Sequence, residues 1–341
     1  MISRLWIFVS CSAFVLTGCK SDRFANDPVI EKFEISHLNL VDSLAATSKK
    51  NPDLALQDLY HSFGNLWLAY CEDLMKFGPA NDSLAYEGIQ AFLHHPDMLD
   101  ANEAIQQKFT SQLPTFDAEF DHAFYRYQGY LGDKPIPTIV YLNSGFNFSV
   151  LPQEGYLGIG MEYFLGTDHP VVQHLNPQVF PQYMRDKMKS EFLISESLRG
   201  WLLVSYQDDY YSESTLLDVM MYWGKMMFVL DVMLPEASDA VKMSYTAEEQ
   251  AWCEQNERNI WIEISKQEVL YEKRRFEINH WIDDGPFTNA ENIPQDAPSR
   301  LGVWMGREIV RDYMQRNDDV TLQDLLKETN YMPMLNAYRP D

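Results

Sequence analysis

The most continuous apolar run in the chain beyond its N-terminal signal extends from Leu216 to Leu234, with the sequence LLDVMMYWGKMMFVLDVML. A helix of this length is nearly 30 Å long, about the width of a small domain or of a bilayer. Asp218, Lys225 and Asp231 argue against a membrane span, because a central charge there costs at least ~2.5 kcal/mol. A soluble helix that is apolar on almost every face needs other elements packed around it. We therefore expect this segment to be the central helix of the fold.

Three polar side chains interrupt this helix in a regular way. Asp218, Tyr222 and Lys225 are spaced i, i+4 and i+7, so they fall on one stripe of the cylinder. The stripe is either a polar seam whose groups are satisfied inside the core or the lining of a pocket. Both interpretations stay open at this point.

The first nineteen residues indicate export and lipidation. Arg4 precedes an almost wholly apolar segment from Leu5 to Leu16, which is typical of a signal peptide. Leu16-Thr17-Gly18-Cys19 fits the lipobox, in which Cys19 is acylated, for example with palmitate, and becomes the first mature residue. We predict a signal peptide over 1–18, a lipid-proximal tether over 19–28 and one large domain over 29–341.

The charge of the chain excludes several kinds of partner. It has 27 basic and 50 acidic residues, and loss of Arg4 with the signal leaves a net charge near −24. Such an excess repels nucleic acids and anionic lipid head groups, so membrane attachment has to come from acyl chains. Apolar residues make up 46% of the chain, which is enough to fill a large core.

The remaining pattern predicts an α+β fold that is predominantly helical with a small central sheet. Within it, we distinguish a looser helical part over 29–135 from a core over 136–341 that a family resemblance, given below, covers. Cys71 and Cys253 could pair in an oxidising compartment, but helical, aromatic-rich surroundings favour two free thiols.

Periodicity predicts helices over 53–75, 83–93, 98–109, from Pro114 onward, 181–206, 216–234, 246–271, 300–316 and after Thr321. It predicts strands over 136–142, 155–160 and, less regularly, 30–40.

Sequence patterns of familiar catalysis are missing. None of the eight histidines belongs to a His-Glu-x-x-His motif, which places two imidazoles one helical turn apart to hold Zn²⁺. Ser144 precedes Gly145 but lacks the Gly-x-Ser-x-Gly context of a nucleophile. Cys253 lies beside Trp252 and has no histidine nearby, so core packing explains it best. We predict no catalytic residue, no metal site and no cofactor.

Five phrases in the second half of the chain resemble the gliding-motility lipoprotein GldB family of gliding and type IX-secreting bacteria. The resemblance covers most of the chain from Ile136 onward and implies an envelope lipoprotein that supports gliding or type IX secretion, with protein partners in that machinery. The phrases are GIGMEYFLGTDHP (Gly158–Pro170), MMYWGKMMFVLDVMLP (Met220–Pro235), YTAEEQAWCEQNERNIW (Tyr245–Trp261), GPFT (Gly285–Thr288) and APSRLGVWMGREIVRDYM (Ala297–Met314).

The same layout looks like a distant relation of the zincin-type metallopeptidases, which suggests a degenerate form of that fold. On this comparison, Met221–Lys225 takes the place of the zinc-binding motif, and Glu254–Glu257 lies in the segment that supplies the third ligand. With both histidines and the catalytic glutamate missing, we expect Lys225 to form an ion pair with Glu254, or else to extend along its helix to water. The candidate polar core or pocket consists of Asp218, Tyr222, Lys225, Glu254 and Glu257.

These observations favour a non-catalytic lipoprotein over two alternatives, a metallopeptidase-like hydrolase and a ligand- or glycan-binding lipoprotein. Lys20-Ser21-Asp22-Arg23 contains only one acidic residue, whereas the resemblance implies that surface export in these bacteria favours an acidic cluster after the lipid site. We therefore expect the protein on the periplasmic face of the outer membrane.

Overall fold

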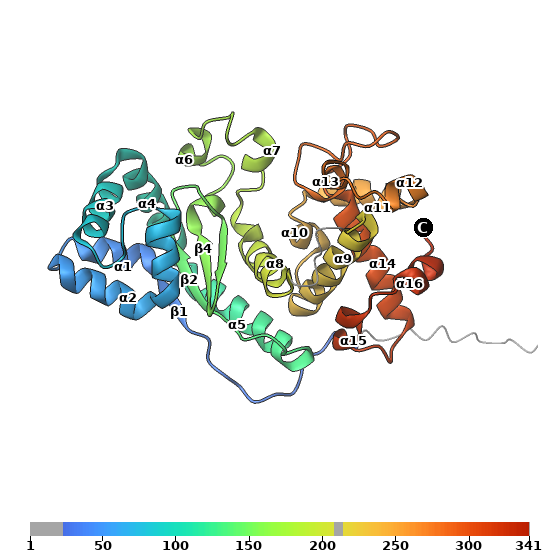
Figure 1. The fold of residues 1–341 in the computed structure, drawn as a ribbon, viewed down its shortest axis with the longest axis horizontal. Coiled ribbons are helices and arrows are strands. Elements are labelled where there is room, and N and C mark those ends of the chain that lie inside the picture. Colours follow the sequence, from blue (N-terminus) through green and yellow to red (C-terminus); the bar gives the residue numbers. More distant parts are fainter. Residues whose placement is uncertain (1–22, 208–213, 341) are drawn as a thin grey trace, which may run out of the picture.

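The computed structural model describes residues 23–207 and 214–340. The expected signal peptide, residues 1–18, and the lipidation site Cys19 lie outside the described residues. The fold is mostly helical with a four-stranded mixed sheet, which confirms the predicted α+β class (Figure 1).

The sheet has the order β1-β2-β4-β3 and separates two hydrophobic cores. β1 and β4 run parallel to β2, and β3 runs antiparallel to β4. Because side chains alternate along a strand, Ile139 and Tyr141 of β2 enter the larger core while Val140 and Leu142 enter the smaller one. The strands are β1 (His37–Asn39), β2 (Thr138–Leu142), β3 (Val150–Gln153) and β4 (Tyr156–Gly160).

Two glycines of β4 allow a close backbone approach, as their spacing predicts. A Cβ atom on Gly160 would overlap the carbonyl oxygen of Phe148, and one on Gly158 would lie 2.9 Å from Cδ2 of Leu142. Only a residue without a side chain fits at Gly160, whereas a methyl group at Gly158 would require the Leu142 side chain to shift.

The first three N-terminal helices form the smaller core on one face of the sheet, whereas α4 and α5 contribute to the larger core (Figure 1). The predicted helix 53–75 is divided, because Gly64 adopts a φ of 49° and the chain then makes a π-helical turn over Ala69–Leu74. The helices of this part are α1 (Leu40–Thr47), α2 (Pro52–Leu68), α3 (Ser83–His94), α4 (Pro96–Phe109) and α5 (Leu113–Tyr130).

The C-terminal half is helical throughout and is built around α9 (Leu216–Met233). Thr215 caps α9 in a capping box with Asp218, and Thr246 caps the next long helix in the same way with Glu249. The other helices are α6 (Pro170–Gln173), α7 (Gln182–Arg185), α8 (Leu193–Ser205), α10 (Asp239–Met243), α11 (Ala247–Ile264), α12 (Gln267–Leu270), α13 (Arg275–Ile282), α14 (Leu301–Arg316), α15 (Leu322–Lys327) and α16 (Met332–Ala337).

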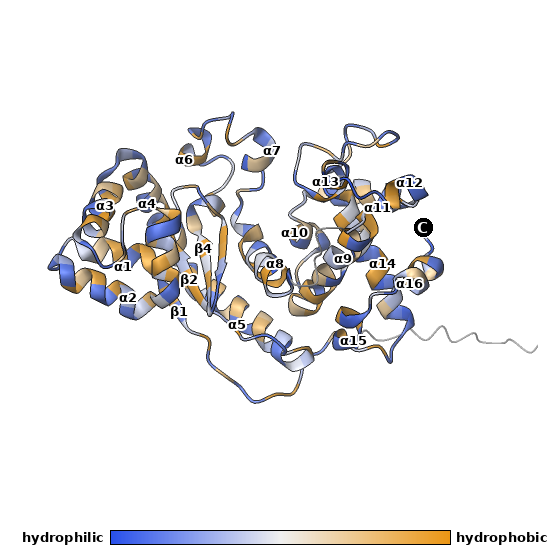
Figure 2. Ribbon diagram, viewed as in Figure 1, coloured by the Kyte–Doolittle hydropathy of each residue, from blue (hydrophilic) through white to orange (hydrophobic). Residues whose placement is uncertain are grey.

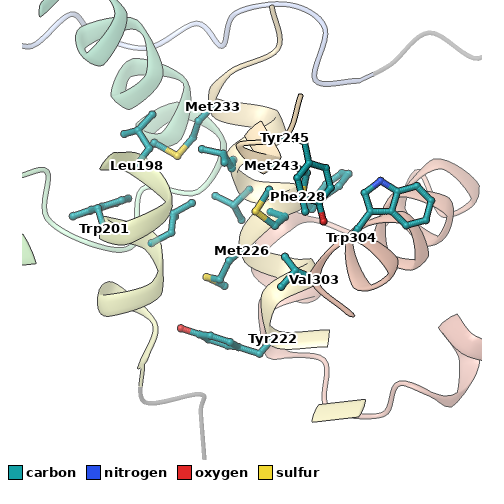
Figure 3. Close-up of a cluster of buried hydrophobic side chains, with 14 of the residues drawn as sticks. Leu198, Trp201, Tyr222, Met226, Phe228, Met233, Met243, Tyr245, Val303 and Trp304 are labelled. Carbon is teal, nitrogen blue, oxygen red and sulfur yellow. The ribbon is translucent and has the colours of Figure 1, made fainter. Parts of the chain in front are cut away.

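α9 is the central helix that its composition predicts. Figure 3 shows Trp201 of α8 and Trp304 of α14 on either side of the α9 side chains, among them Met226. α9 and α14 also cross with their backbones in contact, because a Cβ on Gly224 would overlap the carbonyl oxygen of Gly306. Figure 2 shows hydrophobic residues concentrated along β4, α8 and α9.

The two described cysteines belong to different cores. Cys71 lies in the smaller core, Cys253 lies in the larger one, and both are free and fully buried. Burial raises the pKa of the Cys71 thiol to about 12, so it stays protonated at neutral pH.

Candidate functional site

The polar stripe of α9 is satisfied largely by nearby backbone. Asp218 accepts hydrogen bonds from the backbone nitrogen of Thr215 at 2.8 Å and from its hydroxyl at 2.7 Å. The hydroxyl of Tyr222 donates to the carbonyl oxygen of Leu203 in α8 at 2.7 Å. Tyr222 also lines a cavity of about 340 Å³ between α8, α9 and α13. The stripe thus combines features of the seam and of the pocket.

The expected ion pair between Lys225 and Glu254 is wrong for the described residues. Lys225 is 5% exposed, and its Nζ donates to the carbonyl oxygens of Leu326 at 3.2 Å and Glu328 at 2.6 Å. These carbonyls lie at the C-terminal end of α15, where unpaired carbonyl groups carry partial negative charge. Glu254 instead accepts a hydrogen bond from Gln250, one turn earlier in α11.

Glu257, the last predicted member, faces a different cleft. It accepts a hydrogen bond from the hydroxyl of Tyr338, and both residues line a cleft of about 1010 Å³. The cleft is bordered by α9, α10, α14 and the C-terminal segment after α16. The five predicted residues therefore do not form one site.

A network of ion pairs forms one wall of this cleft. Arg307 is fully buried, and its Nη2 lies 2.6 Å from Asp231 Oδ1 and 2.6 Å from Asp239 Oδ1. Arg311 follows at i+4 on the same face of α14, with Nε 2.7 Å from Asp231 and Nη1 2.6 Å from Asp239. Lys242 Nζ adds a third cation 3.2 Å from Asp231. α9, α10 and α14 are joined by these contacts.

The network sets the protonation of its carboxyl groups. Burial alone would raise the pKa of Asp231, but the positive charges of Arg307 and Arg311 outweigh it and lower the pKa to about 2. Burial raises the pKa of Glu308 to about 7, although Arg311 and Arg307 oppose this shift. The cleft thus combines a permanently charged Asp231 with a glutamate that titrates near neutral pH.

Sequence reasoning missed this network. In a chain with 50 acidic residues, the number of carboxylates identifies none of them as special. Two signals were present, namely Asp231 within the apolar run and the i, i+4 pair Arg307 and Arg311 in the last of the five phrases.

A third cavity, of about 690 Å³, lies beyond the carboxyl ends of β2 and β4. Gly145 and Phe146 line it, and both have positive φ, 62° and 59°. Glu162 holds this loop, because its Oε1 accepts hydrogen bonds from the backbone nitrogens of Ser144 at 2.8 Å and Phe146 at 3.0 Å. The Ser144 hydroxyl also donates to Glu162, so this serine has a structural role.

Glu162 is fully buried, and its Oε2 has no hydrogen-bond partner among the residues that the structure describes. Burial raises its pKa to about 7, against the opposing effect of the hydrogen bonds from the loop. His169 and His174 line the same cavity. Within 23–207 and 214–340, however, no group of three His, Cys, Asp or Glu side chains is placed to hold a metal ion.

The fold and these sites define a helical α+β protein with a central apolar helix and a buried ion-pair network. In the part of the chain that the structure describes, no helix has the length and apolar character of a membrane span. The chain belongs to the family described as gliding motility protein GldB, a lipoprotein family whose model matches residues 24–340. This match confirms the resemblance seen in the sequence. Neither the curated proteins nor the solved structures contain a match, and the expected zincin-like fold therefore finds no support.

Proposed function

We propose that this chain is a non-catalytic lipoprotein of the cell envelope that supports gliding motility, the assembly of type IX secretion machinery, or both. The family match over residues 24–340 carries the proposal, since it spans nearly the whole chain after the lipobox. The buried polar groups support it, because Asp218, Tyr222 and Lys225 make local or backbone hydrogen bonds of the kind that stabilise a fold.

The proposed anchor is a lipid on Cys19, and the proposed place is the periplasmic face of the outer membrane. The lipobox Leu16-Thr17-Gly18-Cys19 motivates the first part, and the lack of an acidic cluster in Lys20–Arg23 motivates the second. Mass spectrometry of the mature N-terminus tests the lipid. Digestion of intact cells with proteinase tests the location, and loss of the protein from intact cells would refute a periplasmic position.

Protein partners in the gliding and secretion machinery follow from the proposal, and crosslinking in the native envelope tests them. A photoreactive amino acid is placed at Val179 or at Phe276, whose side chains are 60% and 73% exposed. The same substitution at the fully buried Ile309 serves as the matched control. We expect components of the machinery to be captured from an exposed position but not from Ile309. Capture of no such component from either position would contradict the proposal.

Ligand binding is the second candidate, and the cavity of about 690 Å³ favours it. Ligands of proteins with parallel strands commonly bind beyond the carboxyl ends of those strands. Phe146 and Phe180, whose ring centroids are 5.9 Å apart, give this cavity an aromatic wall. Calorimetric titration with envelope glycans would detect such a role. Zinc retained after extensive dialysis would instead favour a hydrolase.

A further inference from the structure

The sequence predicts a tether over residues 19–28. The second half of this segment is instead bound to the body of the protein. Arg126 of α5 is 1% exposed and binds this segment through several hydrogen bonds. Its Nη1 donates to the carbonyl oxygen of Asn26 at 3.1 Å and to Asp27 Oδ1 at 2.6 Å, and its Nη2 donates to the carbonyl oxygen of Phe24. Its Nε donates to the carbonyl oxygen of Val232 in α9 at 2.6 Å. One buried guanidinium therefore joins the N-terminal segment, α5 and α9. We call residues 23–28 the strap.

Two tyrosines and a glycine of α5 add to this attachment. The hydroxyl of Tyr130 donates to the carbonyl oxygen of Asn26 at 2.6 Å, and that of Tyr125 donates to the carbonyl oxygen of Pro28 at 3.0 Å. Pro28 lies directly on Gly129, where a Cβ atom would overlap its ring. The strap is thus fitted to α5 by hydrogen bonds and by shape.

The strap ends at the cleft of about 1010 Å³. Phe24 packs edge-on against Tyr130 and Phe228, with ring centroids 5.1 and 5.8 Å apart. Arg23 donates a hydrogen bond to the carbonyl oxygen of Asp318, just after α14. Both Arg23 and Phe24 line the cleft.

We infer that the strap holds the cleft against the membrane surface, an inference that rests on the proposed lipidation of Cys19. Cys19 precedes Arg23 by four residues, and four fully extended residues span at most about 14 Å. If Cys19 carries the lipid, the bilayer surface lies within that reach of Arg23. The rim of the cleft is then the part of the body nearest to the lipid head groups.

The charge of the cleft lining is more compatible with a position at the membrane surface than the charge of the whole chain is. Its lining has five basic and six acidic side chains, whereas the full sequence has 27 and 50. A nearly balanced surface is repelled little by anionic head groups, while the strongly acidic remainder is repelled. Charge and chain length thus favour the same orientation.

Fluorescence quenching by lipids tests the orientation. The lipidated full-length protein is reconstituted into phosphatidylethanolamine–phosphatidylglycerol vesicles that contain head-group nitroxide lipids. A fluorophore is attached to Arg339→Cys at the cleft, or to Leu84→Cys on α3 at the other end of the molecule (Figure 1). Cys71 and Cys253 are fully buried and escape labelling.

We expect severalfold stronger quenching at Arg339→Cys than at Leu84→Cys. Gly129→Ala should reduce this contrast, because the added methyl displaces Pro28, while alanine suits the helix better than glycine and leaves the body folded. Gln128→Ala, an exposed neighbour on α5, should keep the contrast. Circular dichroism of each variant verifies folding.

Mass spectrometry of the same sample distinguishes a failure of the proposed lipid anchor from a failure of the proposed orientation. An acylated protein with equal quenching at both labels would overturn the orientation and leave the anchor intact. An unacylated Cys19 would overturn the anchor and the orientation together. A contrast that survives in Gly129→Ala would overturn the role of the strap.

Discussion

At the scale of single residues, the buried charge of Arg307 depends on Asp231. Asp231→Asn removes this carboxylate and leaves the guanidinium only partly compensated, so we expect the free energy of unfolding to fall by ~3–5 kcal/mol. Asp58→Asn is the matched control, because Asp58 pairs with Lys50 at the surface and should contribute less than ~1 kcal/mol. Urea denaturation measures both variants. Equally small effects would show that the network is not important for stability.

Glu162 makes stability depend on pH. Its pKa is raised from 4.5 to about 7, so the folded protein binds this proton more tightly than the unfolded chain does. The free energy of unfolding should therefore decrease as the pH rises from 4.5 to 7, by about 3 kcal/mol at most. Glu308 contributes a similar slope, since burial also raises its pKa to about 7, so Glu162→Gln should reduce the total slope rather than abolish it. Glu154→Gln, at an exposed position, should retain the full slope. Denaturation at a series of pH values gives the answer, and an unchanged slope in Glu162→Gln would contradict it.

For the polar stripe on α9, the sequence predicts the position of each residue on the helix but not its hydrogen-bond partners. Helical spacing correctly placed Asp218, Tyr222 and Lys225 on one helix. It could not identify the partners of Lys225, which are carbonyl groups about one hundred residues later in the chain. Spacing describes one element, whereas these contacts depend on where α15 packs.

At the scale of elements, the crossing of α9 and α14 requires glycine. A methyl group at Gly224 would overlap the carbonyl oxygen of Gly306, and both atoms belong to backbones that cannot easily move. We expect Gly224→Ala to lower the free energy of unfolding by ~1–3 kcal/mol or more, as overpacked cores do. Gly285→Ala is the control, since its new Cβ would meet nothing closer than 3.5 Å. A Gly224→Ala protein as stable as the control would rule out the close crossing.

Long helices with clear periodicity were predictable, and short or interrupted ones were not. α9 and α14 begin and end within one residue of the expected bounds. The helix expected over 181–206 is instead divided into α7, a 3₁₀ turn and α8. Between α7 and α8, the carbonyl oxygen of Met188 accepts a hydrogen bond from the distant backbone nitrogen of Gly166. α13 and α16 were missed, since helices of eight and six residues form only when packed against a partner.

At the scale of the whole molecule, the sequence predicted the fold class but not the attachment of the strap. The short segment from Lys20 to Pro28 is mostly polar, so its composition suggested a free linker. Its partner, Arg126, lies within an aromatic helix about one hundred residues later. Such long-range contacts, like the cleft that they border, arise only from the assembled tertiary structure.

We propose that lipid attachment at Cys19 allows this GldB-family protein to support gliding. The most direct test is the gliding speed of cells whose only copy carries Cys19→Ser, compared with cells that carry the wild-type chain. We predict that the variant accumulates as a protein released from the membrane fraction, or retained there only by its uncleaved signal, and that gliding is lost. Gliding at wild-type speed with an unacylated protein would contradict the claim.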